Sequence, residues 1–513
     1  MTIQEYVERG RKAVEAIKDY DQAQTDKLVY EAAKIIYQHA AELAREAVDE
    51  TGLGYYEDKI CKNTDTPAAF WAYLRDKKSV GIISENKETG IIEVAHPVGV
   101  IACVTPATNP NVTPLGNFMD AVKGKNAIIV SPAPRAAKST THTVELIREA
   151  MVKCGAPADL IQVLSEVTLA NSQALMEACD LVIATGGSGM VKAAYSSGTP
   201  AYGVGPGNPP VVLDRGYDLK EAAKMTVTAV GSDNGILCDG DNLLLYPQEE
   251  EEKFFQALKD EGVVLFEEKG DVEKFGAVLF HDGHPVPELV GKDAPVIAKA
   301  AGFDIPKDTK VMGLKIDAVG KANVLNKEIM GPIVVLKGYE SFEEAVAMAI
   351  QNMEEAGGIG HTAGIFSNDR KHIEYYGERI PVARVLVNQP TPDAWGPSTN
   401  GLSPAVSESC GTWGNNILCE NVDYIHLINV SKARGRKNSI LALVDRMERS
   451  AIEPEKQTVF ISHGDCLADA EFLAQEVRRR LHVPRIEINY VGPVIGAHSG
   501  PGTLALFFLG TAR

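Results

Sequence analysis

Residues 99–104 read Gly-Val-Ile-Ala-Cys-Val, an apolar run that stops at the Thr-Pro pair of residues 105–106. So short a run, bounded by glycine and proline, is typical of a strand buried on both faces. Two similar runs follow at residues 127–130 and 180–184. The helical segments between and around them lie at residues 113–124, 138–154 and 168–178. This alternation predicts a largely parallel, doubly wound α/β sheet.

The chain on either side of this sheet has its own pattern. Residues 2–50 predict two helices, because apolar side chains recur there at helical spacing. A second stretch of alternating strands and helices runs from about residue 226 to residue 405. Pro, Gly, Ser and Thr crowd residues 389–404, which predicts a long loop able to line a pocket. At 513 residues, the chain is long enough for about three domains.

The composition argues against several classes of function. A formal net charge of -18 disfavours general binding to nucleic acid or to a membrane surface. The eight cysteines are scattered, with no CxxC pair and no Cys/His spacing typical of a metal site. We see no signal peptide and no apolar run of about 18 residues. We therefore expect a cytoplasmic protein with reduced thiols, no bound metal, and neither nucleic acid nor membrane as partner.

Two segments carry chemistry. Residues 185–187, Thr-Gly-Gly, follow the third apolar run and open a helix. They form either a phosphate-binding turn or a tight turn that binds nothing. Residues 233–238, Asp-Asn-Gly-Ile-Leu-Cys, end on a candidate nucleophile. A cysteine thiolate that adds to an aldehyde forms a thiohemiacetal, whose hydride a nicotinamide can accept.

Several segments together resemble those of one enzyme family, and they occur in the same order along the chain as in that family. They are TPATNP at 105–110, SPAPR at 131–135, TGG at 185–187, GVGPGN at 203–208, DNGILC at 233–238, KEIMGP at 327–332, GIGHT at 358–362, RVLVN at 384–388 and CGTWG at 410–414. Over about residues 1–430 this combination resembles the CoA-acylating aldehyde dehydrogenases, including the aldehyde dehydrogenase half of bifunctional aldehyde/alcohol dehydrogenases. The resemblance implies a Rossmann-type cofactor domain and an α/β catalytic domain, with NAD as cofactor and coenzyme A as co-substrate.

The resemblance also implies three catalytic residues. Cys238 would be the nucleophile, and a buried structural cysteine is the alternative. Asn109 would donate to the oxyanion together with the backbone N–H of Cys238, unless it only opens an Asx-Pro turn. His361 would position or deprotonate the CoA thiol, and a hydrogen-bonded structural histidine is the alternative.

A second group of residues would contact the cofactor. Glu328 would bind the ribose hydroxyls on the nicotinamide side, and a plain surface carboxylate is the alternative. Gly187 and Gly205 would let the cofactor approach the backbone closely. The other cofactor-binding residues that the resemblance implies are Thr108, Pro110, Ser131 and Pro132.

Two departures from the family pattern affect the expected product and rate. Hydrolytic aldehyde dehydrogenases carry a glutamate that activates water against the thioester, and the matching residues 203–208 contain no carboxylate. We therefore expect the acyl-enzyme to await CoA, which gives an acyl-CoA. Asp239 and Asp241 follow Cys238, where relatives more often have Ala and Ser. Nearby carboxylates oppose thiolate formation unless their side chains point away, and an ordinary thiol has a pKa of about 8.5.

The end of the chain resembles a different family. KARGRK at 432–437, VFISHGD at 459–465 and GPVIGAHSGPG at 492–502 resemble the C-terminal end of DegV-type fatty-acid-binding proteins. The N-terminal lobe of that family has no counterpart here. The tail predicts strands at 457–462 and 485–491, a helix at 468–481 and an apolar end at 503–509. Such a half-domain leaves a sheet edge and an apolar face uncovered.

The predicted organisation and reaction follow. Residues 1–225 form the NAD-binding domain with the N-terminal helices, 226–410 the catalytic domain, 411–430 a return to the cofactor or oligomerisation region, and 431–513 the partial DegV-like segment. The reaction is reversible NAD-dependent oxidation of a short aldehyde, acetaldehyde by default, to its acyl-CoA. The alternatives are an acylating sulfoacetaldehyde dehydrogenase, a hydrolytic aldehyde dehydrogenase, and a lipid-binding fusion with an inactive dehydrogenase body. Family habit implies a homo-oligomer, either dimer or tetramer.

Overall fold

The computed structural model describes residues 1–86 and 89–511. They form two compact units. The first, which we call the body, comprises residues 1–77 and 97–428, and the second, the C-terminal unit, comprises residues 78–96 and 429–513. Within the described ranges, every helix is too short or too polar to cross a lipid bilayer.

Four helices open the body, at α1 (Ile3–Ala16), α2 (Gln22–Gln38), α3 (Ala40–Thr51) and α4 (Tyr56–Leu74). Capping boxes fix the starts of the first two, because Thr2 and Asp21 bond reciprocally with the third residue of each helix. The prediction of two helices over residues 2–50 is wrong, since α2 and α3 are separate. A single residue, His39, breaks the helix there. The apolar periodicity continues on both sides of it, so the break leaves no gap in the sequence pattern.

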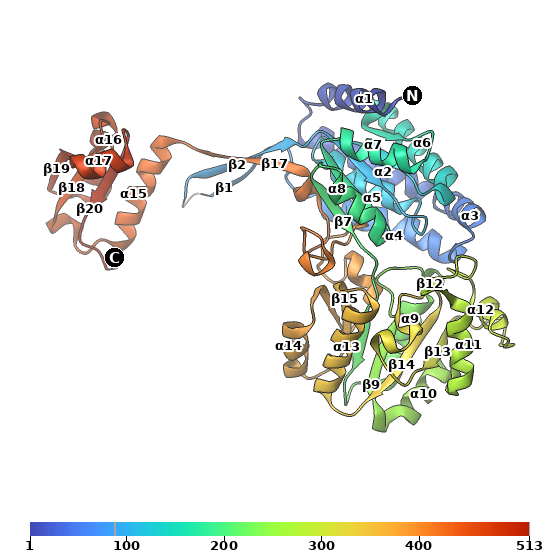
Figure 1. The fold of residues 1–513 in the computed structure, drawn as a ribbon. Helices are drawn as coiled ribbons and strands as arrows, with labels where there is room; N and C mark the ends of the chain where they lie inside the picture. Colours follow the sequence, from blue (N-terminus) through green and yellow to red (C-terminus); the bar gives the residue numbers. More distant parts are fainter. Residues whose placement is uncertain (87–88, 512–513) are drawn as a thin grey trace. The chain divides into compact units, whose positions relative to one another are not determined.

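The first sheet of the body is parallel, in the order β5-β4-β3-β6-β7. Its strands are β3 (Val100–Val104), β4 (Ala127–Ser131), β5 (Ile161–Val163), β6 (Leu181–Thr185) and β7 (Ala201–Val204). The connecting helices are α5 (Val112–Lys123), α6 (Ala137–Lys153), α7 (Leu169–Ala178) and α8 (Ser188–Ser196) (Figure 1).

Alternate side chains of β3 enter two different cores. Ile101 and Cys103 pack with apolar side chains of α2, α5 and α6, whereas Val100 and Ala102 pack with those of α1 and α7. A strand that feeds a core on each face needs helices on both sides of its sheet. The predicted doubly wound α/β arrangement is confirmed.

The second sheet of the body has seven parallel strands, in the order β10-β13-β14-β9-β8-β15-β16. The strands are β8 (Pro210–Leu213), β9 (Leu243–Pro247), β10 (Val264–Phe266), β13 (Met312–Lys315), β14 (Ile333–Tyr339), β15 (Gly360–Phe366) and β16 (Val382–Val387). Its helices are α9 (Leu219–Gly231), α10 (Glu251–Asp260), α11 (Lys269–Leu279), α12 (Ala294–Ala300), α13 (Phe342–Ala356) and α14 (Arg370–Arg379). Two apolar cores cover the two faces of this sheet.

The chain passes from one sheet to the other between residues 204 and 210, not at the expected boundary of 225. Strand β8 and helix α9 belong to the second sheet, because Val211, Ala222 and Val230 lie in one of its cores. An isolated strand and helix have the same pattern in either sheet. Only the pairing of β8 with β9 and β15 assigns them.

The C-terminal unit begins with a sheet built from two distant parts of the chain. Strands β1 (Gly81–Asn86) and β2 (Ile91–Pro97) form an antiparallel hairpin. Strand β17 (Ile428–Arg434) adds to it in the order β1-β2-β17. The third strand therefore follows the hairpin by more than 300 residues.

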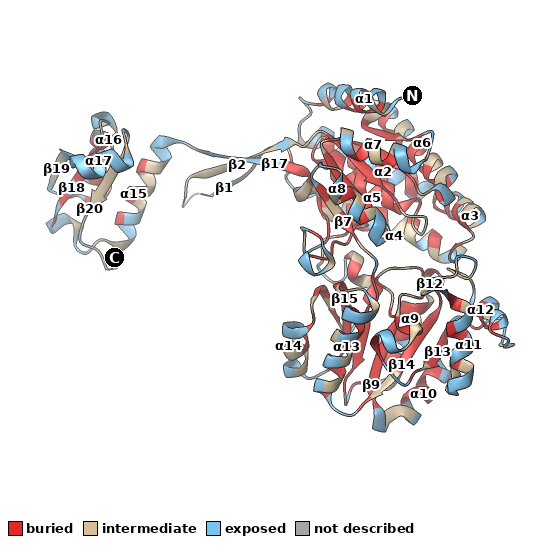
Figure 2. Cartoon of the chain, in the orientation of Figure 1, coloured by how far each residue is buried: buried red, intermediate tan, exposed pale blue. Residues whose placement is uncertain are grey.

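The tail forms a small sheet, in the order β19-β18-β20. Its elements are α15 (Arg436–Ser450), β18 (Thr458–His463), α16 (Leu467–Leu481), β19 (Arg485–Tyr490), α17 (Pro493–Ser499) and β20 (Leu504–Phe507). Val459 and Ile461 of β18 face a core shared with Val444 and Leu473. Phe460 and Phe507, paired across β18 and β20, are 50% and 55% exposed. Figure 2 shows buried residues in most strands of the two body sheets, whereas β19, β20 and α17 have none.

Candidate active site

The segment that carries Cys238 leaves helix α9 through a left-handed turn. Asp233, Asn234 and Gly235 have φ angles of 49°, 55° and 66°. Glycine is required at the last position, because a Cβ there would lie 2.2 Å from the carbonyl oxygen of Gly331. Two non-glycine residues in this conformation are unfavourable and need support from surrounding groups.

That support comes from a buried ion cluster. The Asp233 carboxylate is fully buried and accepts from the Nζ of Lys59 at 2.9 Å, the Nζ of Lys62 at 2.6 Å and the backbone N–H of Tyr55 at 2.7 Å. Burial raises the pKa of the Asp233 carboxyl, but the two ammonium groups outweigh it and hold that pKa below its ordinary value. Burial lowers the pKa of Lys59 to about 8. Helix α4 thus holds the turn before the nucleophile in place.

The same two lysines hold the loop that contains Asn109. Lys62 donates to Asn109 Oδ1 at 2.8 Å, and Lys59 donates to the carbonyl oxygen of Thr108 at 3.1 Å. Because the ammonium of Lys62 takes the amide oxygen, the amide nitrogen of Asn109 remains as the donor that can serve the cavity. Helix α4 therefore fixes both the turn before Cys238 and the amide opposite it.

Cys238 opens into a cavity of about 680 Å³, within the usual range for a small-molecule site. Eight of the ten predicted site residues line it: Thr108, Asn109, Ser131, Pro132, Gly187, Gly205, Cys238 and Glu328. The other two, Pro110 and His361, do not. Pro110 is buried behind the loop, where its carbonyl oxygen accepts from the Thr140 hydroxyl at 3.1 Å. Within residues 1–86 and 89–511, no cluster of three or more His, Cys, Asp or Glu side chains is arranged to hold a metal ion.

One part of the cavity has the geometry of a cofactor cradle. A Cβ added at Gly187 or at Gly205 would meet no atom within 4 Å, so both backbones are open to a bound molecule. Gly187 directly precedes helix α8, whose first N–H groups favour an anion such as a pyrophosphate. Ser131 and Pro132, at the end of β4, line the same cavity. These residues fit a dinucleotide.

Glu328 lies close to the nucleophile. It lines the cavity with Cys238 and is hydrogen-bonded by the backbone of Gly207. Burial raises the pKa of its carboxyl to about 8. Gly207 itself packs against the nucleophile segment, since a Cβ there would lie 1.7 Å from the carbonyl oxygen of Cys238. Only glycine can occupy this position.

The surroundings of Cys238 disfavour its thiolate. Burial raises the pKa of the thiol well above its ordinary value, and the nearby carboxyl groups of Asp239, Glu408 and Glu328 raise it further. Asp239 lines the cavity beside Cys238, so its side chain does not avoid the nucleophile. The thiol therefore needs a group that takes its proton.

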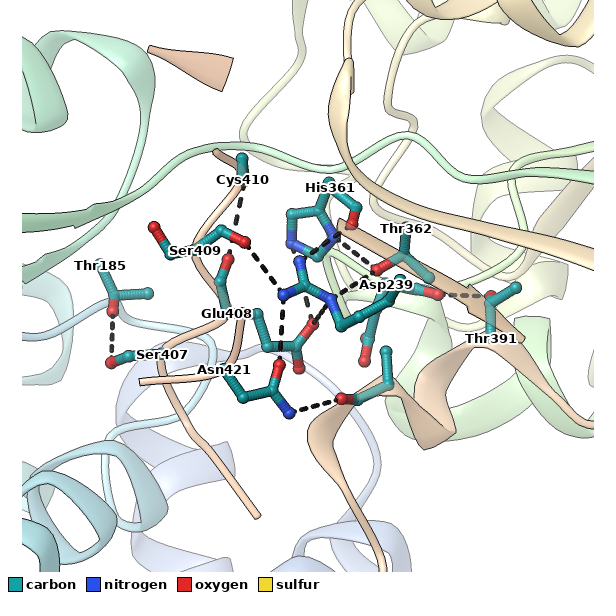
Figure 3. Close-up of polar contacts among 12 residues, drawn as sticks. Thr185, Asp239, His361, Thr362, Thr391, Ser407, Glu408, Ser409, Cys410 and Asn421 are labelled. Carbon is teal, nitrogen blue, oxygen red and sulfur yellow. Dashed lines mark hydrogen bonds and ion pairs between the residues drawn. The ribbon is translucent and has the colours of Figure 1, made fainter. Parts of the chain in front are cut away.

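His361 is fully buried in strand β15, in a network that includes Arg384 and Glu408 (Figure 3). Its Nδ1 lies 3.0 Å from the Thr362 hydroxyl, and its Nε2 lies 4.0 Å from Glu408 Oε2. Burial and the charge of Arg384 hold the pKa of His361 well below its ordinary value. The imidazole is therefore neutral.

Sequence reasoning missed two residues of this site, Lys62 and Glu408. Lys62 belongs to a helix with one other lysine, Lys59, and nothing local separates it from a surface residue. Glu408 stands just before the CGTWG segment at 410–414, in the sequence SESCG. The signal available in the sequence was an acidic residue close to a family segment, but the nearness of that residue to Cys238 depends on tertiary structure.

Comparison with known proteins agrees with this geometry. An acetylating succinate-semialdehyde dehydrogenase of Clostridium kluyveri is 45% identical over 433 residues, which are 84% of this chain and 95% of that protein. A sulfoacetaldehyde dehydrogenase of an Acholeplasma species is 35% identical over 432 residues, covering 83% of this chain and 89% of that protein. The crystal structure of an acetylating aldehyde dehydrogenase from Geobacillus thermoglucosidasius matches with a TM-score of 0.82 and 36% identity, over 84% of this chain and 96% of that one.

Family profiles divide the chain between the two resemblances. The profile of the aldehyde dehydrogenase family matches residues 1–266 and 316–401, and that of the uncharacterised DegV family matches residues 418–511. Both resemblances are confirmed. The chain belongs to the CoA-acylating aldehyde dehydrogenases and continues into a DegV-like C-terminal segment.

Proposed function

We propose that the protein oxidises a short aldehyde to its CoA thioester, reversibly, with NAD as hydride acceptor. The observation that carries this proposal is the position of Cys238, which opens into the cavity shared by Asn109 and the open glycine backbones of Gly187 and Gly205. A nucleophile, an oxyanion donor and a dinucleotide cradle in one cavity are the parts that the reaction needs.

The residues act in two half-reactions. The Cys238 thiolate adds to the aldehyde carbon, and the oxyanion accepts hydrogen bonds from the Asn109 amide and from the backbone N–H of Cys238. Bound NAD supplies the acceptor for the hydride, which carries two electrons away from that carbon. The remaining thioester on Cys238 is attacked by the CoA thiolate, and Cys238 leaves as a thiolate. One proton, from the CoA thiol, is released per turnover.

The cofactor residues keep the roles that the sequence predicts, with one change. Gly187 and Gly205 would contact the dinucleotide through their backbones, and Glu328 would bind the ribose. Thr108, Ser131 and Pro132 would complete the binding surface. Pro110, which is buried, would act by shaping the loop that presents Asn109.

The expected product is an acyl-CoA and not a free acid. Residues 203–208 place no carboxylate where hydrolytic relatives have their base, and Gly207 packs there against the carbonyl of Cys238. Water near the thioester then lacks that activating group, and the thioester persists until CoA arrives.

The charge of the cavity bears on the substrate. Its lining includes seven carboxylic side chains, namely Asp58, Asp65, Asp233, Asp239, Glu328, Asp393 and Glu408. Lys62 is the one basic side chain among the described lining residues, and Asp233 and Asn109 already occupy it. An anionic aldehyde finds no uncommitted cation there. We therefore propose a short uncharged aldehyde, with acetaldehyde as the default.

A second substrate class is favoured by the names of two relatives. Succinate semialdehyde and sulfoacetaldehyde, named for the proteins that are 45% and 35% identical to this chain, both carry a distal anion. Either would have to draw Lys62 away from Asp233. These two aldehydes are the direct rivals of acetaldehyde.

The test is NADH formation, followed by absorbance, with acetaldehyde, succinate semialdehyde and sulfoacetaldehyde, each with and without CoA. We expect CoA-dependent reduction that Cys238→Ala abolishes, with the highest kcat/KM for acetaldehyde. Reduction without CoA would show a hydrolytic enzyme. A preference of tenfold or more for either anionic aldehyde would overturn the substrate assignment, while leaving the acylating reaction intact.

A further inference from the structure

Two basic side chains meet at the C-terminal end of helix α3. The Nε of Arg135 donates to the carbonyl oxygen of Thr51 at 2.7 Å. The Nζ of Lys292 donates to the carbonyl oxygen of Gly52, also at 2.7 Å. A Cβ added at Gly52 would lie 3.0 Å from Lys292 Nζ and 3.9 Å from Arg135 Nη2, so the two cationic groups are close neighbours.

This pair of cations has hydrogen-bond donors to spare. Among the described residues, neither Nη group of Arg135 has an acceptor, and the Lys292 ammonium uses one of its three N–H groups. Glu50, near the end of α3, is committed elsewhere, because it accepts from the backbone N–H groups of Lys138 and Ser139 at 2.8 and 2.7 Å. Helix carbonyls attract cations, but they do not neutralise two full charges. The pair can therefore bind an anion.

The fold places Arg135 where a dinucleotide-binding sheet contacts the adenosine ribose. In the order β5-β4-β3-β6-β7, the chain starts at β3, continues outward through β4 and β5, and returns to β6. In sheets with this winding, an acid near the end of the second strand binds the ribose hydroxyl of NAD, whereas an arginine accommodates the phosphate of NADP. At the end of β4, residues 131–135 read Ser-Pro-Ala-Pro-Arg and contain no carboxylate. Pro134 lines the cavity, directly before Arg135.

Lys292 reaches the same place from the loop before helix α12. Its neighbour Gly291 donates its N–H to the carbonyl oxygen of Met330 at 2.9 Å. A Cβ at Gly291 would lie 2.7 Å from Ile236 Cγ2, so this loop packs tightly. Met330 and Ile236 both line the cavity. Lys292 is therefore held beside the cavity wall.

On the basis of the proposed function, we further propose that Arg135 and Lys292 bind a phosphate monoester on the adenosine ribose of a cofactor. Two cofactors of this class of reaction carry that group. CoA has it at the 3′ oxygen of the ribose and NADP at the 2′ oxygen, whereas NAD has none. The two Nη groups of Arg135 fit two phosphate oxygens, and the Lys292 ammonium adds a point charge. The pair thus selects among adenosine cofactors by their ribose phosphate.

A purely structural pair would behave differently. If Arg135 and Lys292 only capped α3, their removal would weaken the binding of every cofactor alike or would only lower the stability. A phosphate site instead loses affinity for the phosphorylated cofactor alone. The contrast requires two matched ligand pairs, CoA with dephospho-CoA and NADP with NAD, because the members of each pair differ by this phosphate only.

The measurement is isothermal titration calorimetry of the full chain with these four ligands, in a phosphate-free buffer. In at least one pair, we expect the phosphorylated member to bind more tightly by about tenfold or more. Arg135→Gln should reduce that preference to about threefold or less, while the Kd of the unphosphorylated member stays within about twofold. The ligand pair that shows the effect identifies the source of the phosphate.

Three further variants make the result independent of one substitution. Lys292→Gln should reduce the preference in the same direction, and Arg135→Lys should retain part of it, because a charge without the guanidinium fork remains. Arg379→Gln is the matched control, because Arg379 is an exposed arginine that donates to the carbonyl oxygen of Tyr375 in helix α14, away from the cavity lining. It should leave all four affinities unchanged. Melting temperatures verify that each variant is folded.

Binding needs no turnover, so its outcome is separate from the proposed reaction. A preference for the ribose phosphate that disappears in Arg135→Gln supports the inference even if no tested aldehyde is oxidised. Equal binding within both ligand pairs, or a preference that folded Arg135→Gln retains, overturns it, even if the wild-type enzyme makes acyl-CoA. CoA-dependent NADH formation in the wild type, measured in parallel, judges the proposed function alone.

Discussion

Strands alternate with helices both in the body and in the tail of the C-terminal unit, but the resulting sheets differ in size and in how far their faces are buried. The sheets of the body have five and seven strands and are covered by apolar cores on both faces. The tail has three strands with one core, and Phe460 and Phe507 remain about half exposed on the other face. A sheet of short parallel strands forms a stable domain only when enough helices and further strands pack around it to bury both of its faces. The comparison therefore places the chemistry in the body and the unsatisfied surface in the tail.

Among the changes that test this contrast between body and tail, loss of the nucleophile should have the largest effect. Cys238→Ala should reduce CoA-dependent NADH formation by about 10³-fold or more, because the proposed thiohemiacetal and thioester form on the Cys238 sulfur. Binding of NAD, followed by fluorescence, should stay within about twofold, since its cradle does not involve the thiol. If oxidation survived this change, the chemistry would lie outside the site described above.

The ion cluster at the turn before Cys238 should matter to the stability of the body alone. Asp233→Asn leaves Lys59 and Lys62 without their carboxylate, and breaking such a buried pair costs about 3–5 kcal/mol. The wild-type pKa is depressed, so this stabilisation is present above the ordinary carboxyl pKa of about 4 and is lost as pH falls through the folded-state pKa.

Urea unfolding of wild type and Asp233→Asn between pH 7 and pH 3.5 measures that effect. The difference in unfolding free energy should shrink as pH falls, and the tail transition should not move. A difference that grows in acid would mean that Asp233 is not ionised in the folded body.

Equal truncations in the two regions should differ in what they unfold. Leu115→Ala in α5 and Leu473→Ala in α16 both remove a fully buried side chain, at about 2–5 kcal/mol each. The core around Leu115 is large and should hold the body together, whereas the single small core around Leu473 should open. Hydrogen exchange should report loss of protection in β18 only for Leu473→Ala. Equal loss in body strands would show that the two regions unfold as one.

Substitution of Lys62 tests whether catalysis in the body depends on a fixed orientation of the Asn109 amide. Lys62→Met frees the Asn109 amide and should lower kcat/KM by about 10- to 100-fold, because the oxyanion then loses an oriented hydrogen bond. The control is Lys12→Met, at an exposed position of α1, which should have no effect. A rise in KM for anionic aldehydes alone, with acetaldehyde oxidation unchanged, would instead identify Lys62 as a substrate-binding cation.

The smallest expected effect comes from removal of the tail. A chain that ends after residue 434 keeps both sheets of the body and the strands β1, β2 and β17. Its kcat/KM should remain within about twofold of the full chain, and it should aggregate less, because exposed side chains such as Tyr490 and Leu509 are gone. Light scattering and NADH formation measure both. A large loss of activity would mean that the DegV-like segment supports catalysis.

The sequence was sufficient where structure is local. The strands at 99–104, 127–130 and 180–184 were predicted within about a residue of β3, β4 and β6, because an apolar run between turn residues already specifies them. The tail strand predicted at 457–462 and the helix at 468–481 likewise agree with β18 and α16 within about a residue. The break at His39 was not predictable, since a one-residue interruption leaves the periodicity intact.

The site divides in the same way. Eight residues chosen from family segments meet in one cavity, although they come from loops far apart in the chain. Glu408 and Lys62 were missed because their significance lies in their contacts in the folded chain. Glu408 Oε2 lies 3.9 Å from Arg384 Nε and 4.0 Å from His361 Nε2. The ammonium of Lys62 donates to both Asp233 and Asn109. Composition and spacing carry no signal for such contacts. His361 was chosen for its type and setting, but burial in β15 determines what it can do.

The sheet β1-β2-β17 has a consequence for the order of events during synthesis. Its hairpin leaves the ribosome early, and its third strand follows more than 300 residues later. At about 5–20 residues per second, the open edge of β2 waits roughly 15 s to a minute for its partner. During that interval strand β17 of a neighbouring nascent chain can pair with β2, and on a crowded polysome the two copies would exchange this strand. Translation speed is thus one of the variables that decide which chain completes this sheet.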